Sequence, residues 1–487
     1  MTIASDIGFL ENLGRQIEAI DERPLVRARR RRRLLTIAAA TLAIGIAVLG
    51  AIGGWSRWIA DRPSEAGVAS GGSGQSVWEP FPITSPAAPG SRHAIGGPAN
   101  IPDVPVLTGI TADPSGRVWL TGRTGVNDID STGWVAYLEG GAWHTLPLSE
   151  NVAGRIFAPV SPADVWFAVD GGFTHWDGAT TTTTSVPFLD GDVGWPTEMT
   201  ATTSDDVWAV GHRQGDLYKS PGDGPGEHTV GYLPVAMHWD GSTWADPRVP
   251  EYPGRSSELV AVSARGGEVW AVGSYEVKLG EREQSGGGLP MEVLRQGPIV
   301  VRWIGEGWEA VGTAGLGADD LSLWDVKVLG TDDAWVLGGE QLGGTRSAQV
   351  IAHWDGAGWT RIPSPDGVRK NDDHPTYRSL SVTSDTDLWL AGDGRNGSGD
   401  AEMAHWDGAT WRIFPMTEVE LETERGSSSL SSAMADVVAL SPTDVWFNPG
   451  FTSFSTDDPA SAAAPLAHWD GAIWSLIATP DPSVVAD

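Results

Sequence analysis

A histidine and an aspartate recur two residues apart along this chain, in the order His-Trp-Asp-Gly. In an extended strand, residues two apart point to the same side, so each imidazole would lie near a carboxylate, a pair of groups able to bind a metal ion. Copies spread along the chain cannot converge on one ion, so we predict that each histidine bonds a turn backbone or a carboxylate within its own repeat. We therefore predict no metal centre and no cofactor, with structural calcium as the alternative. The pairs are His175 with Asp177, His238 with Asp240, His353 with Asp355, His405 with Asp407, and His468 with Asp470.

A second set of aspartates stands two residues before a repeated tryptophan. Short polar side chains at such positions often accept hydrogen bonds from the backbone of a tight turn. We expect these aspartates to cap the turn that precedes the tryptophan strand. They are Asp164, Asp206, Asp333, Asp387 and Asp444.

Two polar clusters do not repeat, and they are the better candidates for a ligand site. Either cluster could bind a cation or hydrogen-bond a ligand, and either could be a solvated turn. The chain shows no Ser-His-Asp order, phosphate loop or paired-carboxylate motif above chance, so no catalytic residue is assigned. The first cluster is His212, Arg213, Asp216 and Tyr218, and the second is Asp372, Asp373 and His374.

The tryptophans define the elements that must position these residues. Successive copies lie between 42 residues (Trp166 to Trp208) and 65 residues (Trp270 to Trp335) apart. The complete repeat contains an apolar strand, a polar turn, the tryptophan strand, a strand that ends in His-Trp-Asp-Gly, and a last strand with a second tryptophan. Three repeats depart from it: the first has Tyr137-Leu138-Glu139-Gly140, the second has threonines 180–184 in place of the last tryptophan, and the fourth has Trp303-Ile304-Gly305. The Asp-Gly pair favours a two-residue hairpin turn. Seven such repeats predict an all-β, seven-bladed β-propeller over residues 105–480. The repeated positions are Trp119, Trp166, Trp208, Trp270, Trp335, Trp389 and Trp446.

The segment from His353 to Trp359 resembles the Asp-box turn of BNR and sialidase-type propellers, although it lacks the residue between Asp and Gly. The Gly and Trp periodicity is also similar to that of kelch and galactose-oxidase-like propellers. These resemblances imply a fold and no particular activity. Arg361-Ile362-Pro363 matches a sialidase element, but Arg412-Ile413-Phe414 fills the same repeat position, and the Tyr–Cys crosslink of galactose oxidase requires a cysteine, which the chain lacks.

Connection lengths predict one functional face. In an antiparallel four-stranded blade, the connections between strands 2 and 3 and those between blades leave from the same end. Long, variable connections on a rigid scaffold are where binding usually resides. The longest are residues 212–234, 274–298, 361–378, 415–435 and 451–465.

The N-terminal part predicts a membrane anchor. Residues 34–54 contain no charge, and 21 residues match the roughly 20 that a helix needs to cross a bilayer. Six arginines precede this segment, which predicts a cytoplasmic stub at residues 1–33 with a short amphipathic helix, and an extracytoplasmic propeller. A cleaved signal peptide is the alternative. Residues 55–104 form a Gly/Ser/Pro-rich linker, in which 77–82 could be an extra strand that closes the ring, starts a vestigial blade or stays outside.

Charge and composition narrow the function. The chain has no cysteine and a net charge of −31; because residues 1–33 carry +3, the remainder carries −34. Such an acidic domain excludes nucleic acid as a partner. We therefore expect a membrane-anchored module that recognises an extracellular protein, glycan or envelope component through its long-loop face. The alternatives are an extracytoplasmic glycoside hydrolase or lyase and a transmembrane sensor.

Overall fold

The computed structural model describes the part of the chain that forms a β-propeller. All described residues belong to one compact unit, which covers residues 61–126 and 131–487. The predicted stub, the predicted membrane helix at 34–54 and the second polar cluster (Asp372, Asp373 and His374) lie outside the described residues. Within the described part, no helix has the length and apolar character needed to cross a membrane. The described residues are 76–78, 83–84, 106–124, 132–148, 156–186, 194–219, 228–282, 291–317, 320–342, 346–365, 369–370, 377–393, 401–415, 435–449 and 466–477.

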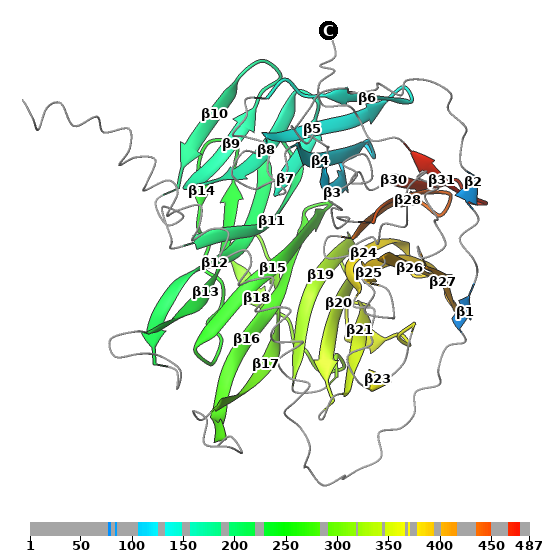
Figure 1. Cartoon of the computed structure of the whole chain (residues 1–487). Coiled ribbons are helices and arrows are strands. Elements are labelled where there is room, and N and C mark those ends of the chain that lie inside the picture. The colour runs from blue at the N-terminus through cyan, green and yellow to red at the C-terminus, as the bar shows by residue number, and fades with distance from the viewer. Residues whose placement is uncertain are drawn as a thin grey trace, which may run out of the picture. The chain divides into compact units, whose positions relative to one another are not determined.

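Seven antiparallel sheets of four consecutive strands are arranged as blades around a centre (Figure 1). The predicted all-β, seven-bladed propeller is confirmed. Blades 1 to 4 contain β3 (Val106–Ala112), β4 (Val118–Thr124), β5 (Thr132–Glu139), β6 (Ala142–Thr145); β7 (Phe157–Ser161), β8 (Asp164–Val169), β9 (Gly172–Trp176), β10 (Thr181–Ser185); β11 (Gly194–Thr203), β12 (Asp206–Tyr218), β13 (Thr229–Trp239), β14 (Trp244–Ala245); and β15 (Ser256–Arg265), β16 (Glu268–Arg282), β17 (Met291–Trp303), β18 (Trp308–Ala310). Blades 5 to 7 contain β19 (Leu321–Gly330), β20 (Asp333–Gln341), β21 (Arg346–Trp354), β22 (Trp359–Arg361), with β23 (Arg369–Lys370) on β21; β24 (Tyr377–Ser384), β25 (Asp387–Asp393), β26 (Ala401–Trp406), β27 (Trp411–Pro415); and β28 (Asp436–Ser441), β29 (Asp444–Asn448), β30 (Leu466–Trp469), β31 (Trp474–Ile477).

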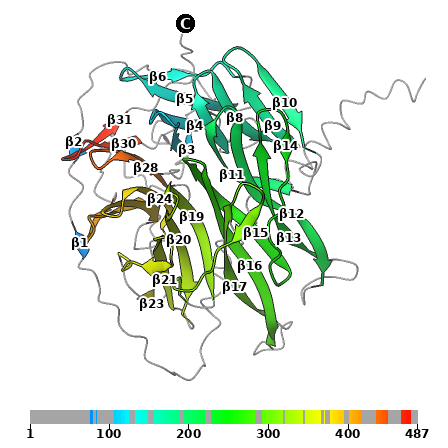
Figure 2. The ribbon, with the colours of Figure 1, turned by 180° about the vertical axis from the view of Figure 1, so that it is seen from behind.

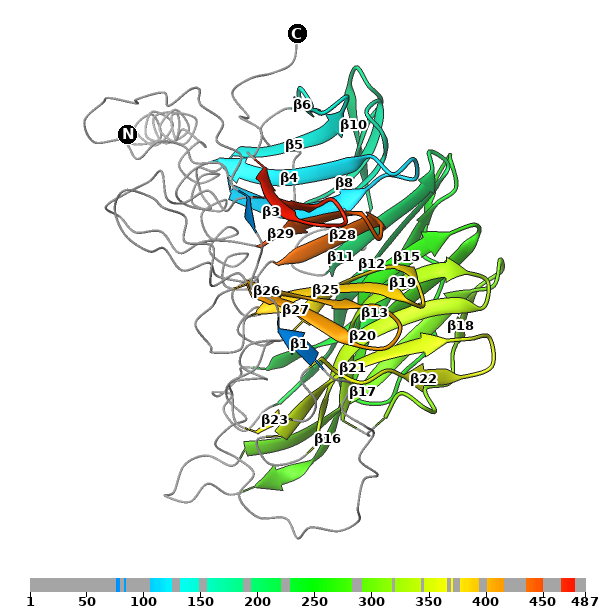
Figure 3. The same ribbon diagram turned by 90° about the vertical axis from the view of Figure 1, so that its right-hand side faces the viewer.

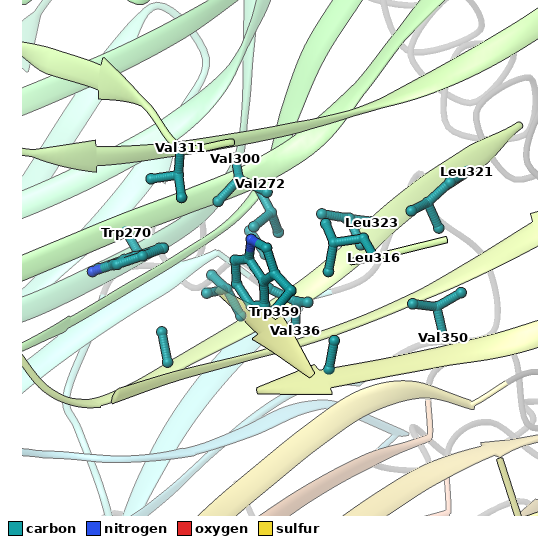
Figure 4. Packing of buried hydrophobic residues seen from close by; sticks show 14 of the residues in the cluster. Trp270, Val272, Val300, Val311, Leu316, Leu321, Leu323, Val336, Val350 and Trp359 are labelled. Carbon is teal, nitrogen blue, oxygen red and sulfur yellow. The ribbon is translucent and has the colours of Figure 1, made fainter. Parts of the chain in front are cut away.

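The core lies between neighbouring blades. Each blade is covered by another blade on both faces, which explains why the second strand of a blade is almost continuously apolar. Trp270 and Val300 of blade 4 pack against Leu323, Val336 and Trp359 of blade 5 in one buried cluster (Figure 4). The ring therefore holds by side-chain packing between sheets, which suits a chain without disulfides.

In the part of the chain that the structure describes, blades 7 and 1 meet without exchanging a strand. Trp446 and Leu466 of blade 7 share a buried cluster with Leu107 and Leu120 of blade 1. Trp143 adds an edge-on ring contact to Trp446, with the ring centroids 5.9 Å apart. Figure 2 shows these two blades side by side from behind. The ring thus closes through packing of the same kind that joins its other blades.

Two short strands precede the first blade and pair with the last two. β1 (Ser76–Trp78) runs parallel to β27, the outer strand of blade 6, and β2 (Ile83–Thr84) runs parallel to β31, the outer strand of blade 7. Both are drawn in blue at the rim in Figure 1. Of residues 77–82 the structure describes 77 and 78, which belong to β1; β1 and β2 each add a fifth strand to a complete blade, an arrangement that differs from all three alternatives.

Two of the predicted long loops are extended hairpins instead. β12 and β13 pair from Val207 with Trp239 out to Tyr218 with Thr229, and β16 and β17 pair out to Arg282 with Met291. Figure 3 shows β16 and β17 reaching past the other blades at the lower left. The prediction of loops over 212–234 and 274–298 was therefore wrong. Gly, Asp and Arg interrupt the apolar pattern there and indicate a loop, but backbone pairing continues through them.

Candidate functional site

Each repeated histidine joins two strands of its own blade. His238 Nε2 hydrogen-bonds Asp206 Oδ1 at 2.9 Å and its ring stacks on Trp208, with the centroids 3.9 Å apart. Trp208 Nε1 donates to the same carboxylate oxygen at 2.8 Å. Equivalent His–Asp bonds of 2.7–2.9 Å join His175 to Asp164, His353 to Asp333, His405 to Asp387 and His468 to Asp444. Across the described ranges, no group of three or more His, Asp or Glu side chains could hold a metal ion.

The turn-capping role belongs to the other aspartate of each repeat. Asp240 Oδ1 accepts the backbone N–H groups of Ser242 and Thr243 at 2.9 and 2.8 Å. The Ser242 hydroxyl and these two backbone groups lower the pKa of Asp240 to about 2. Asp177, Asp355, Asp407 and Asp470 accept equivalent pairs of backbone bonds. The expectation that the aspartates before the tryptophans cap turns is corrected, since Asp206 accepts instead from the side chains of His238, Trp208 and Thr202.

The first predicted polar cluster lies on β12, and its members point to different partners. Buried His212 has its Nδ1 3.6 Å from Glu258 Oε2, and Arg213 Nη1 lies 3.3 Å from Asp246 Oδ2. The Tyr218 ring lies under the Arg255 guanidinium, with Cζ 4.4 Å from the ring centroid, and Asp216 is exposed. The structure therefore places all four on one hairpin without bringing them together as one site.

Most of the exposed large apolar side chains lie on the two extended hairpins. Among the described residues, the exposed large hydrophobics are Leu217 (56%), Tyr232 (37%), Leu233 (45%), Leu279 (52%) and Ile304 (57%). The first three lie on β12 and β13 and Leu279 lies on β16, whereas Ile304 lies in the β17–β18 turn of the opposite face. We call Leu217, Tyr232, Leu233 and Leu279 the hairpin patch. Sequence reasoning missed it because it looked for polar groups; apolar residues inside an insertion were the available signal.

Carboxylates outnumber cations beside the hairpin patch. Arg255 Nε donates to Glu276 at 2.8 Å, and both Arg255 and Lys278 contact Glu292. Burial, with the neighbouring Glu276 carboxylate, raises the pKa of Glu258 to about 7. The hairpin patch is thus an apolar surface with mostly acidic side chains beside it.

Another cluster of charged side chains, separate from those beside the hairpin patch, lies in the central channel. This channel is a cavity of about 480 Å³ lined by the first strand of every blade. Lys327 Nζ lies 2.6 Å from Asp325 Oδ1, and Glu198 and Asp436 line the same cavity. Burial raises the pKa of Glu198 against the attraction of Lys327. At the channel lining, the Arg378 guanidinium stacks on Trp324, with Cζ 3.9 Å from the ring centroid. None of these residues was a sequence candidate.

The channel side chains join neighbouring blades. The inner strand of a blade has an unpaired edge, whose N–H groups need acceptors. At four blade junctions the acceptor comes from the inner strand of the preceding blade. Glu198 accepts from Val262 N at 2.7 Å, Ser263 from Val328 N at 3.1 Å, Asp325 from Leu380 N at 2.7 Å, and Ser381 from Ala439 N at 2.8 Å. Convergent charged groups in the channel are what the catalytic alternative requires, and the described residues contain such a group; its carboxylates Glu198 and Asp325 also accept backbone N–H groups of the next blade.

Comparison with known proteins finds solved structures of low sequence identity and no family. No protein-family model matches the chain, and no curated protein matches it. The β-propeller domain of the Trilobed protease from Pyrococcus furiosus is 12% identical and covers 77% of this chain and 98% of its own, with a TM-score of 0.43. YCF48 from Cyanidioschyzon merolae (13% identity, 72% and 95% coverage, TM-score 0.37) and the Aleuria aurantia lectin (13%, 75% and 92%, 0.37) are also similar. Scores at this level carry no functional argument; strand pairing defines a seven-bladed β-propeller, and the Asp-box or kelch type stays a resemblance.

Proposed function

We propose that this protein is a non-catalytic recognition module that binds another protein through the extended hairpins of blades 3 and 4. The observation that carries this proposal is the hairpin patch: four of the five exposed large hydrophobics in the described residues lie on these two hairpins. Exposed apolar groups on projecting elements, surrounded by polar groups, are typical of protein interfaces.

The chemistry of the patch favours a protein over a glycan. Three of its four members are leucines, which complement aliphatic side chains, whereas sugars stack on flat aromatic faces. Repeat tryptophans such as Trp119, Trp208 and Trp270 are buried in the blades. Because the chain after residue 33 carries −34, we expect the partner to present apolar side chains flanked by basic ones.

The proposal includes a single membrane anchor at residues 34–54, supported by its 21 uncharged residues and the six preceding arginines. On intact cells that express the full chain, added protease should digest the propeller and leave an N-terminal tag protected. A shortened chain released into the medium would instead support the cleaved signal peptide.

Leu217→Asp and Leu233→Asp should weaken partner binding at least tenfold, about 1.4 kcal/mol or more each, because a charge in an apolar contact remains desolvated. The partner is first identified by photo-crosslinking from position 217 or 233 of the full chain. Affinity of the purified partner for the full chain is then measured by calorimetry at two salt concentrations.

Ile304→Asp is the matched control, because Ile304 is equally exposed but lies on the opposite face. Its affinity should stay within about twofold of the parent. Equal losses for all three variants, or crosslinking from position 304 to the same partner, would show that the hairpin patch is not the binding surface.

A further inference from the structure

We propose that the outer edge of β17, at the tip of the blade 4 hairpin, binds an extended segment of the partner protein as an additional β-strand. This inference rests on the proposed function, because it takes the partner to be a protein, and it adds where and how that partner pairs. Backbone pairing at a strand edge and side-chain contact on the hairpin patch are separate interactions, so each can be removed without the other.

β17 extends far beyond the outer strand of its blade. β18 pairs only with residues 301–303, so β17 from Met291 to Val300 has β16 on one side and, in the part of the chain that the structure describes, no strand on the other. The tip of this hairpin reaches past the other blades (Figure 3). Such an edge presents N–H and C=O groups at the spacing of a strand, which is a template for pairing with another chain.

The bonds at the base of the edge show which backbone groups point outward. Gln296 N donates to Asp320 Oδ1 at 2.9 Å, and Val300 O accepts from Val311 N at 2.9 Å. In an antiparallel ladder, alternate residues direct their N–H and C=O groups to the same side. Leu294 has the same phase as these two residues of β17, so its N–H and C=O groups point away from β16.

Protection of this edge ends before the tip. Pro298 has the outward phase and carries no N–H, and the Gln296 N–H is already bonded to Asp320. Prolines protect exposed edges from unwanted pairing. Within the described residues, nothing bonds the outward N–H and C=O groups of Leu294. The edge is therefore open at Leu294, although it is closed to pairing at 296–298.

Other blades of this chain already accept short additional strands at the same kind of edge. In blade 5, β23 pairs with Arg346 and Ser347 of β21, beyond the reach of β22. Arg346 lies eight residues before Trp354, as Arg295 lies eight residues before Trp303 in blade 4, so the two edges correspond. β1 and β2 likewise pair with the outer strands of blades 6 and 7. The blade 4 edge offers the same backbone without a strand on it among the described residues.

The edge favours an extended segment with apolar side chains at alternate positions. Met291, Val293 and Leu294 beside the edge are apolar and half-buried. Neighbouring strands lie about 4.8 Å apart, so the side chains of an added strand would contact those of β17. Leu279 of the hairpin patch is the extra residue of β16 opposite Val293 and Leu294, so the patch continues to this edge.

A second copy of the chain is the less favoured occupant. Each copy carries −34 after residue 33, so pairing two copies brings like charges together. The edge therefore fits a segment of another protein better than a segment of this one.

A short peptide tests the edge without the natural partner. The probe has alternating valine and threonine with a lysine at each end, and its analogue is N-methylated along both edges, which keeps the side chains and the charge but prevents pairing. In hydrogen exchange of the full chain, read at single residues, the Leu294 amide should exchange at least threefold more slowly with about 1 mM peptide than without it. The analogue should have no effect, and the amides of β20 should not change with either peptide.

Leu294→Pro tests the same edge with the partner captured by crosslinking from position 217 or 233. It removes the outward N–H and keeps the bonds to β16, as Pro298 does, so affinity should fall at least tenfold. Leu294→Ala is the matched control, because it keeps the N–H, and its affinity should stay within about threefold of the parent. Hydrogen exchange at the base of β16 and β17 verifies that both variants keep the hairpin.

Four results would overturn the inference. They are no protection of Leu294 by the peptide, equal protection by the N-methylated analogue, equal losses for Leu294→Pro and Leu294→Ala, and protection that grows with the concentration of the chain alone, which would assign the edge to a second copy. If Leu294→Pro weakens partner binding and Leu217→Asp does not, strand addition stands and the hairpin patch fails. The opposite pattern leaves the patch as the binding surface and removes strand addition.

Discussion

Replacing Lys327 with methionine is expected to lower the free energy of unfolding by about 3 kcal/mol at neutral pH, because it leaves the buried Asp325 carboxylate without its half-buried cation. Lys327 is the cation that balances Asp325, with Glu198 and Asp436 in the same cavity. Asp325 cannot simply move to solvent, because it accepts Leu380 N from the next blade. Chemical denaturation of the full chain and of the variant measures the difference.

The pH dependence of this variant is a second readout. The attraction of Lys327 holds down the pKa of Glu198, which burial raises. Without Lys327 that pKa rises further, so the variant should lose stability more steeply than the parent between about pH 5 and about pH 8. Adding Glu198→Gln, which keeps an acceptor for Val262 N and removes a charge, should recover part of the loss.

Arg302→Met provides the control for Lys327→Met. Arg302 forms an exposed pair with Glu309, with Nη2 2.9 Å from Oε2, and such pairs contribute about 0–1 kcal/mol. If the two variants lose similar stability, or if Glu198→Gln deepens the loss of Lys327→Met, the channel charges do not join the blades as described.

The fold could be predicted because its signals are redundant. Seven copies of the tryptophan strand and five copies of the Asp-Gly turn each specify the same local structure, and Gly241 indeed has a φ of 88°, which favours glycine. Where one repeat departs from the pattern, the other repeats still identify the strand at that position. Among the described residues, the extended hairpins occur in two blades. Gly215 and Asp216 interrupt the apolar pattern of β12, and no other repeat showed that the strand continues through them.

The candidate site was harder because its residues do not repeat. Asp325 and Lys327 stand two apart in the mostly apolar run Leu321–Gly330, which places them on one side of a strand. That spacing was a usable signal for a polar channel, but only the closed ring shows that Glu198 and Asp436, far away in sequence, line the same cavity. Exposure of Leu217 and Leu233 likewise depends on packing between blades, which local sequence does not encode.

Replacing Asp387 with alanine is the second large expected effect, a loss of about 3 kcal/mol in the free energy of unfolding. Its carboxylate accepts from His405 Nε2 at 2.7 Å, Trp389 Nε1 at 3.1 Å and the Thr383 hydroxyl. These donors are on three strands of blade 6, and alanine would leave the buried indole N–H unpaired. Denaturation of the full chain with Trp fluorescence as the readout measures the loss.

The pH dependence of Asp387→Ala separates the hydrogen-bonded carboxylate from simple packing. Burial acts to raise the pKa of Asp387, but the hydrogen bonds from His405 and Thr383 outweigh it and lower the pKa below 3.8. A carboxyl of this kind contributes stability above its unfolded pKa and loses it as pH falls through the folded value. The gap between parent and variant should therefore be full at about pH 7 and shrink below about pH 4. A gap that is the same at both pH values would mean that alanine acts through lost packing.

Asp333→Ala is the matched control, because the same repeat position in blade 5 makes fewer contacts. The Asp333 side chain is 45% exposed against 4% for Asp387, and it hydrogen-bonds His353, while Trp335 Nε1 has no partner. We expect a loss of about 1 kcal/mol or less there. Since the two aspartates occupy equivalent positions, equal losses would mean that the repeat position, rather than the three-donor arrangement of blade 6, determines the stability that each aspartate contributes.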